Sequence, residues 1–235
     1  YLLLGLVCGV GMLLLSLKMR AKPPIPKVSV ASASTLHNDG SRPFGLKPSQ
    51  AQFMLCVAGV ACCVAMAMPQ VHIVAYCSDL GYGAARGAEM LSLMLSCGIV
   101  SRLVSGLICD RIGGIRTLLL GSVLQGVALL AFLPFDGLVP LYVISAIFGL
   151  FQGGIVLSYA IIVREHFSPQ QVGERVGSVI MATLLGMALG GWMSGWIFDI
   201  TGSYKAAFLN GIAWNLLNIS ISTWLFLRLK KHHHV

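Results

Sequence analysis

Long apolar stretches alternate with short polar segments along this chain. A helix that crosses a bilayer core of about 30 Å needs about 20 mostly apolar residues, because each residue adds about 1.5 Å. We identify seven such stretches, at residues 1–17, 51–76, 88–109, 117–134, 138–163, 176–198 and 206–227. None shows strand-like alternation, and a bilayer accepts only helices and closed barrels. The pattern predicts an all-α integral membrane protein with seven transmembrane helices.

One long polar segment separates the first apolar stretch from the other six. Residues 18–50 contain Lys-Pro-Pro-Ile-Pro-Lys and then a run rich in Ser, Ala, Asn and Gly, which predicts a flexible linker. We divide the chain into a first helix at 1–17, this basic linker, a six-helix bundle at 51–227 and a tail at 228–235. Tyr1 opens inside an apolar run without the basic region of a signal peptide, so we expect the chain to begin within a longer protein.

Charged residues are scarce in this chain. The 16 Lys and Arg and 8 Asp and Glu make up 10% of the residues, against about 25% in soluble domains. Hydrophobic residues make up 57%, and the mean hydropathy is +0.84. A soluble surface cannot be assembled from so few charges. The net charge of +8 does not indicate nucleic-acid binding, because the basic residues lie between the apolar stretches, where membrane proteins carry them.

The basic residues are unevenly distributed across the predicted membrane. If the linker lies in the cytoplasm, thirteen of the 16 Lys and Arg lie on that side, and only Arg86 and Lys205 lie on the outer side. The remaining one, Arg102, lies inside a span. Cytoplasmic loops of membrane proteins carry an excess of Lys and Arg. We therefore predict an outside N-terminus and a cytoplasmic C-terminus, in a plasma membrane or bacterial inner membrane.

The six later stretches contain an internal repeat. A shift of 89 residues brings six identical pairs into register: Arg86/Arg175, Ser105/Ser194, Gly106/Gly195, Ile108/Ile197, Asp110/Asp199 and Gly113/Gly202. Matches of Gly and Ser between Gly-rich helices also arise by chance, but the two Asp at equivalent helix ends favour a true repeat. The first copy ends on the cytoplasmic side and the second on the outer side. This arrangement predicts two inverted three-helix units.

The sequence offers no motif of a soluble-type enzyme. The seven Cys form no C-x-x-C pair and no Cys/His spacing of a zinc site. A P-loop, a dinucleotide fingerprint, G-x-S-x-G and H-E-x-x-H are also absent. We expect no enzymatic activity, no cofactor and no metal.

A Gly- and Asp-containing motif occupies the short cytoplasmic loop after the third apolar stretch. Its positions are Gly106, Asp110, Arg111, Gly113 and Arg116. An Asp at a helix end pairs with Arg or caps the next helix, and glycines allow close backbone approach. G-x-x-x-D-R-x-G between two spans resembles the signature loop of the major facilitator superfamily of secondary transporters. That family usually has two basic residues after the last Gly, and the single Arg116 fits the weaker copy that follows the family's eighth helix.

This resemblance implies a twelve-helix transporter of which the chain is the later part. Residues 51–227 are similar to helices seven to twelve, and 1–50 correspond by position only to helix six and the central cytoplasmic linker. The resemblance implies transport by alternating access, with a missing N-terminal half, the lipid bilayer and a small solute as partners. The signature loop would then act on conformational exchange.

Arg102 is the most informative polar residue within the spans. It precedes Asp110 by eight residues, which places it about 12 Å into the bilayer core. A central Arg costs at least about 2.5–3.5 kcal/mol, and its own helix offers no acid within a turn. It therefore needs an acid from another helix, a water-filled cavity or an anionic ligand. A guanidinium presents a planar fork that binds a carboxylate through two hydrogen bonds.

The residues around Arg102 resemble one branch of the superfamily. The string Gly98-Ile-Val-Ser-Arg102-Leu-Val-Ser-Gly106 is similar to the eighth helix of monocarboxylate and oxalate/formate transporters. This implies a small organic anion, a monocarboxylate, as substrate. Animal monocarboxylate members often carry an Asp where this chain has Gly98, and the oxalate/formate members use a Lys in the eleventh helix that this chain lacks. The coupling partner, a proton or a counter-anion, stays open.

Three further polar residues are candidates for the transport path. Counting along the helices places Gln152 and Thr183 near the depth of Arg102, where they would hydrogen-bond a substrate or serve packing. His72 lies toward the outer end of its span and could carry a proton, although an interfacial His needs no such role.

Two other classes of membrane protein share some of these features. A heptahelical receptor also has seven helices and an Asp-Arg pair after the third. The glycines of the loop, the 89-residue repeat and the missing Asn-Pro-x-x-Tyr in the last span argue against it. A non-transporting membrane fragment or scaffold is the other alternative.

Overall fold

The computed structural model of the chain describes residues 6, 9–10, 13 and 43–232. The predicted helix at 1–17 and the linker up to residue 42 therefore lie largely outside the described residues. The chain divides into two units, Tyr1–Gly40 and Ser41–Val235, and the helical bundle belongs to the second.

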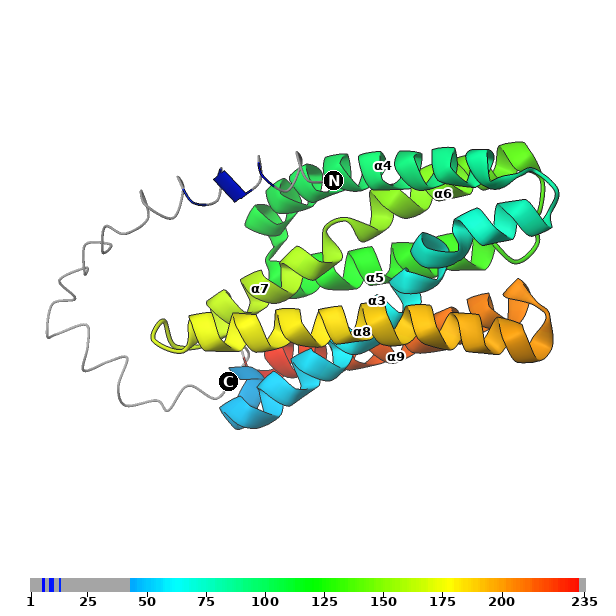
Figure 1. The fold of residues 1–235 in the computed structure, drawn as a ribbon. Helices are drawn as coiled ribbons and strands as arrows, with labels where there is room; N and C mark the ends of the chain where they lie inside the picture. Colours follow the sequence, from blue (N-terminus) through cyan, green and yellow to red (C-terminus); the bar gives the residue numbers. More distant parts are fainter. Residues whose placement is uncertain (1–5, 7–8, 11–12, 14–42, 233–235) are drawn as a thin grey trace, which may run out of the picture. The chain divides into compact units, whose positions relative to one another are not determined.

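Residues 43–232 are helical, with no β-strand among them (Figure 1). A short 3-10 helix, η1 (Pro43–Gly45), comes first. Seven α-helices follow: α3 (Pro48–Asp79), α4 (Ala84–Ile112), α5 (Gly114–Ala131), α6 (Leu138–Gln152), α7 (Ile155–His166), α8 (Val172–Thr201) and α9 (Tyr204–His232). Five segments are long and apolar enough to cross a membrane: α3, α4, α5, α8 and the pair α6–α7 taken together. This confirms the all-α membrane class and five of the predicted spans.

The last predicted span, 206–227, forms part of α9 but is not among these five apolar segments. The helix is 29 residues long, and three asparagines, Asn210, Asn215 and Asn218, lower its mean hydropathy. Asn215 and Asn218 are fully buried against other helices, where the NH₂ group of each donates a hydrogen bond. These two asparagines thus face the bundle interior.

The predicted span 138–163 is present as the apolar segment Leu138–His166, but its helix is interrupted, so that it consists of α6 and α7. Gly153 and Gly154 lie between the end of α6 and the start of α7. A Cβ on Gly153 would collide with the carbonyl oxygen of Gly98, and one on Gly154 with the side chain of Ser105. The two glycines therefore let the interrupted helix touch the backbone of α4, and α4 packs extensively along α6.

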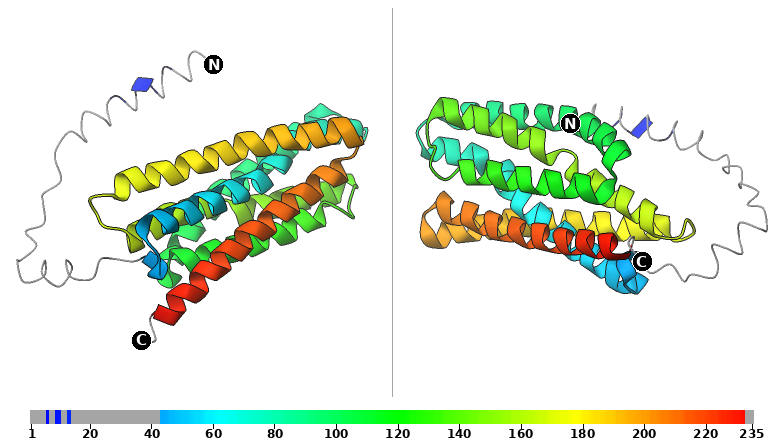
Figure 2. Two further views of the ribbon diagram at one scale, coloured as in Figure 1. Left: turned by 90° about the horizontal axis from the view of Figure 1, so that it is seen from below. Right: turned by 180° about the vertical axis from the view of Figure 1, so that it is seen from behind.

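Helix α3 is central to the bundle. It runs between α8 and α9 in the left view of Figure 2, and it packs against both helices as well as α4. The contact with α8 is close because Gly186 and Gly190 face the backbone of Val60 and Val64. The most apolar part of α3 is 67% buried, against 17% for α4 and 28% for α8. The outer faces of α4 and α8 are therefore left to lipid or to another protein segment.

A buried polar network joins α5 to α7 and α9. Asn218 donates to Ser122 Oγ at 2.8 Å and accepts from the Tyr159 hydroxyl at 2.8 Å. Asn215 donates to Gln125 Oε1 at 3.2 Å. Buried polar groups are stable when they are hydrogen-bonded in this way. The network is structural, because it holds α5, α7 and α9 together inside the bundle.

Candidate functional site

Arg102 lines a cavity of about 370 Å³ between α3, α4 and the α6–α7 break. The other lining residues are mainly apolar: Met66, Leu95, Gly98, Ile99, Gly153, Val156 and Leu157, with the amides of Gln70 and Gln152. The ion pairs found among the described residues join Arg86 to Glu89, Glu165 to His166 and Asp136 to Lys205, so none engages Arg102. Its guanidinium therefore has no ion-pair partner among residues 43–232 and lies at the wall of a mostly apolar cavity.

Gln152 shares this cavity with Arg102. It is the last residue of α6, its side chain is 4% exposed, and its Oε1 is buried without a hydrogen-bond partner in the described part of the chain. A buried amide normally finds a partner, because an unpaired polar group costs about 1–3 kcal/mol. The structure thus brings together two of the three side chains that sequence analysis proposed for substrate binding.

The main chain adds polar groups beside Gln152. Within residues 43–232, no backbone carbonyl accepts a hydrogen bond from the N–H of Gly153 or Gly154. Helix α7 begins next to them, and Gly153 and Val156 line the cavity of Arg102. The N-terminus of a helix carries a partial positive charge. The C-terminus of α6 lies at the same break and carries the opposite partial charge, so the break adds polar main-chain groups but no net positive potential.

Thr183 lies elsewhere, at the contact of α8 with α3. Its hydroxyl donates to the carbonyl oxygen of Ile180 at 2.7 Å, and a Cβ on Gly59 would lie 3.1 Å from its Cγ2. It does not line the cavity of Arg102. Counting residues along a helix gives the depth of a side chain but not the face from which it projects, and the structure does not bring Thr183 to Arg102.

His72 bridges α3 and α8. Its Nε2 lies 3.0 Å from the carbonyl oxygen of Gly191, a geometry that suits the tautomer with the proton on Nε2. The ring is half-buried and is not part of the Arg102 cavity. The Nε2 atom of His72 on α3 thus has a hydrogen-bond partner in the main chain of α8.

The signature loop makes a sharp turn between α4 and α5. Gly113 ends α4 at φ 84°, in a region that favours glycine, and its N–H donates to the carbonyl oxygen of Cys109 at 2.8 Å. Gly202, the repeat partner of Gly113, ends α8 at φ 63° and donates to the carbonyl oxygen of Phe198 at 2.7 Å. Phe198 is offset from Cys109 by the same 89 residues as Gly202 is from Gly113.

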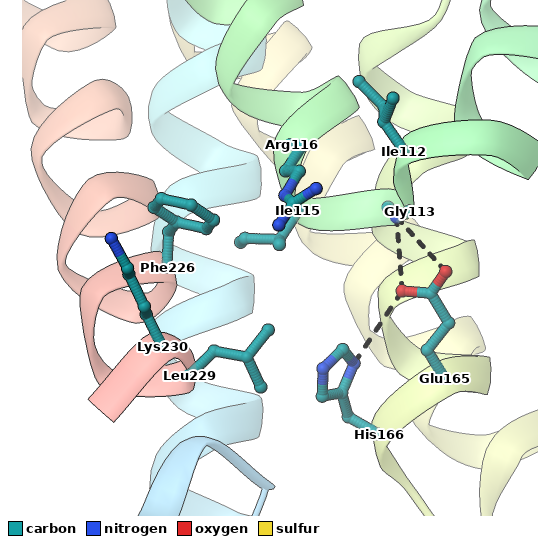
Figure 3. Close-up of a pocket in the computed structure, with 10 residues that line it drawn as sticks. Ile112, Gly113, Ile115, Arg116, Glu165, His166, Phe226, Leu229 and Lys230 are labelled. Atoms are coloured by element: carbon teal, nitrogen blue, oxygen red, sulfur yellow. Dashed lines mark hydrogen bonds and ion pairs between the residues drawn. The ribbon is translucent and has the colours of Figure 1, made fainter. Parts of the chain in front are cut away.

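The acid that caps α5 comes from α7 rather than from the loop. Both carboxylate oxygens of Glu165 accept from the N–H of Gly114 at 3.2 Å, as Figure 3 shows beside Gly113. Asp110, Arg111 and Arg116 are exposed, and Asp110 makes no hydrogen bond or ion pair with a described residue.

Sequence analysis missed Glu165, and it considered an Asp at the helix end as a cap for the next helix. Two features of the sequence could have identified Glu165. It is one of only eight acids in the chain, and it follows Arg164 just after the predicted span 138–163. Gly106, the remaining loop position, is half-buried, and a Cβ there would meet nothing within 4 Å.

Comparison with known proteins is consistent with this architecture. Residues 53–235 match the family described as the Major Facilitator Superfamily. Monocarboxylate transporter 13 of Rattus norvegicus is 31% identical over 144 residues, which are 60% of this chain and 34% of the relative. The protein of the same name from Bos taurus is 29% identical over 144 residues, with the same shares. The match thus spans about a third of the length of either relative. The family match covers most of the chain, and the chain belongs to the Major Facilitator Superfamily.

Proposed function

We propose that this chain is the C-terminal portion of a secondary transporter that moves small organic anions, with monocarboxylates as the substrate class, by alternating access. The observation that carries this proposal is the guanidinium of Arg102, which has no ion-pair partner in the described part of the chain, in a cavity that also holds the Gln152 amide, whose buried Oε1 has no hydrogen-bond partner there. The names of the relatives, both monocarboxylate transporters, support the same substrate class.

A carboxylate matches the chemistry of the cavity. Arg102 supplies a planar pair of N–H donors, and Gln152 and the start of α7 supply neutral dipoles next to it. The walls are otherwise apolar, which suits the hydrocarbon part of a small acid and strengthens the charged hydrogen bonds by lowering the local dielectric. A dicarboxylate would bring a second charge that no other basic residue of this cavity balances.

The arrangement of helices supports two inverted three-helix units, α3 to α5 and α6 to α9. In such a repeat α3 corresponds to α6–α7, α4 to α8 and α5 to α9. The contact between α3 and α8 then has an equivalent between α6 and α4, and this second contact is present in the structure. The contact between α3 and α9 likewise has an equivalent between α5 and the α6–α7 pair, which is also present. The matching turns at Gly113 and Gly202 add local support. We propose that this bundle is helices seven to twelve of a twelve-helix transporter and that residues 1–50 supply helix six and the linker.

The proposal includes an orientation and partners. The excess of basic residues places the linker, the loop at Gly113 and the C-terminus in the cytoplasm. The N-terminal half of the same transporter completes the path, and a proton or a counter-anion provides the coupling. His72, held at the carbonyl of Gly191, is the candidate for proton coupling on this chain.

Transport by the intact protein in proteoliposomes tests the proposal. We expect uptake of labelled short-chain monocarboxylates and none of the corresponding amides, which have a similar shape without the charge. Equal uptake of an acid and its amide contradicts an anion site at Arg102. Uptake of neither, by protein that is folded and correctly inserted, contradicts the substrate class.

A further inference from the structure

A second cavity, of about 640 Å³, lies where α5 begins and where α7 and α9 end. Arg116 lines it from α5 and Lys230 from α9, and Glu165 and His166 line it from α7 (Figure 3). The remaining walls are largely apolar, formed by Ile112, Ile115, Phe226 and Leu229. We call it the cytoplasmic-end cavity, and it shares no lining residue with the cavity around Arg102.

Two basic side chains, Arg116 and Lys230, and one carboxylate, Glu165, line this cavity, which leaves an excess of one positive charge. Glu165 already accepts both hydrogen bonds from the N–H of Gly114 at 3.2 Å. Neither Arg116 nor Lys230 has a carboxylate within ion-pairing distance among residues 43–232. Arg116 lies over the ring of Phe226, 5.9 Å from its centroid, with its charge still available to an anion. The cavity therefore has a positive opening over apolar walls.

The cavity lies at the surface of the membrane. Helix α5 and the α6–α7 pair are membrane-spanning segments, so the start of one and the end of the other lie where hydrocarbon meets water. In the orientation proposed above, this is the cytoplasmic leaflet. The neighbouring outward faces of α5 and α9 expose Leu120, Trp224 and Leu227. A lipid with its headgroup in the cavity would find an apolar surface for its acyl chains beside it.

The chain itself offers no occupant of matching charge. The linker at 18–50 carries six basic residues and the single acid Asp39, and the residues after Lys230 are Lys-His-His-His-Val. Both segments would be repelled by Arg116 and Lys230. We propose that the cavity binds the phosphate headgroup of an anionic phospholipid, with Arg116 and Lys230 as its ligands. Basic pockets between transmembrane helices on the cytoplasmic side bind such headgroups in other membrane proteins.

Thermal unfolding of the intact protein in detergent tests this proposal. Phosphatidylglycerol and phosphatidylcholine with identical acyl chains are titrated separately, and glycerol phosphate serves as the soluble probe. We expect phosphatidylglycerol to raise the unfolding temperature at lower concentrations than the other two probes. A basic residue near an anionic headgroup contributes about 1 kcal/mol, equivalent to about 5-fold in affinity. The double variant Arg116→Gln, Lys230→Gln should therefore bind phosphatidylglycerol about 25-fold more weakly.

A matched control lies next to the site. Lys231 is exposed on α9 and does not line the cavity, so Lys231→Gln removes the same charge from the same helix end. It should leave the preference for phosphatidylglycerol within about 2-fold. An equal loss in Lys231→Gln overturns the proposal in favour of unspecific surface charge. Equal stabilisation by phosphatidylcholine, or by glycerol phosphate alone, also overturns it. Native mass spectrometry of bound lipid provides the same comparison for a variant that is too unstable to melt cooperatively. None of these outcomes depends on transport.

Discussion

Replacing Gln152 with Met should stabilise the protein and weaken its binding of substrate. The side chain of Gln152 is 4% exposed and its Oε1 has no partner among the described residues. Burying such a group costs about 1–3 kcal/mol, and Met keeps the unbranched shape without the amide. We expect the free energy of unfolding to rise by up to about this amount in the absence of substrate. In a chain of this size, about 1 kcal/mol raises the unfolding temperature by about 2–4 °C.

The same substitution removes a ligand of the proposed anion. Rotation of the terminal amide of Gln152 can present its NH₂ group to a carboxylate. A hydrogen bond to a charged group is worth about 1.5–3 kcal/mol, so affinity should fall about 10-fold or more. Unfolding of the intact protein, followed by intrinsic fluorescence with and without a monocarboxylate, measures both effects in one experiment.

Gln125 provides the control for this prediction. It is fully buried on α5, accepts from Asn215 at 3.2 Å and donates to the carbonyl oxygen of Cys62 at 3.4 Å. Gln125→Met leaves the buried NH₂ group of Asn215 without its acceptor and should lower the free energy of unfolding by about 1–3 kcal/mol, with substrate affinity unchanged. If Gln152→Met destabilises the protein as Gln125→Met does, Gln152 is a structural residue and the reasoning about its free amide is refuted.

Three further substitutions test other parts of the account. Asp110→Asn should slow transport while substrate affinity stays within a few-fold, because the residue is exposed at a helix end; normal transport rates in this variant would limit the loop to a role in topology. Glu165→Gln should lower thermal stability by about 0.5–2 kcal/mol through loss of the charged cap on Gly114, and an unchanged unfolding temperature would show that the cap is dispensable. Gly149→Ala should cost about 1–3 kcal/mol, because the new methyl group collides with the carbonyl oxygen of Met94; a stability equal to the wild type would show that α4 and α6 can separate freely.

The apolar pattern of the sequence was sufficient to predict most of the bundle. Helix ends such as the turn at Gly113 followed from Gly and Asp at the end of an apolar run, because both residue types have strong local preferences there. The interruption at Gly153 and Gly154 could not be predicted in this way, since a Gly pair is tolerated in a continuous helix. It forms because α4 approaches closely there, which is a property of the tertiary packing.

The site was predictable only in part for a similar reason. Arg102 stands out in any sequence because a charge in mid-membrane is costly. Gln152 followed from its depth, but the depth argument applied equally to Thr183, which projects toward α3 instead. Glu165 reaches Gly114 across 51 positions of the chain, and such a contact is set by the packing of α7 against α5.

The central claim is that Arg102 binds the carboxylate of the substrate. Substrate-induced thermal stabilisation of the purified intact protein tests it most directly, with wild type, Arg102→Lys and Arg102→Gln compared across a panel of small mono- and dicarboxylates. Stabilisation should be present in the wild type, reduced in Arg102→Lys, which keeps the charge without the planar fork, and nearly absent in Arg102→Gln. Loss of a charged hydrogen bond corresponds to about 10- to 150-fold in affinity. Equal stabilisation of Arg102→Gln and wild type by the same anion would contradict the account.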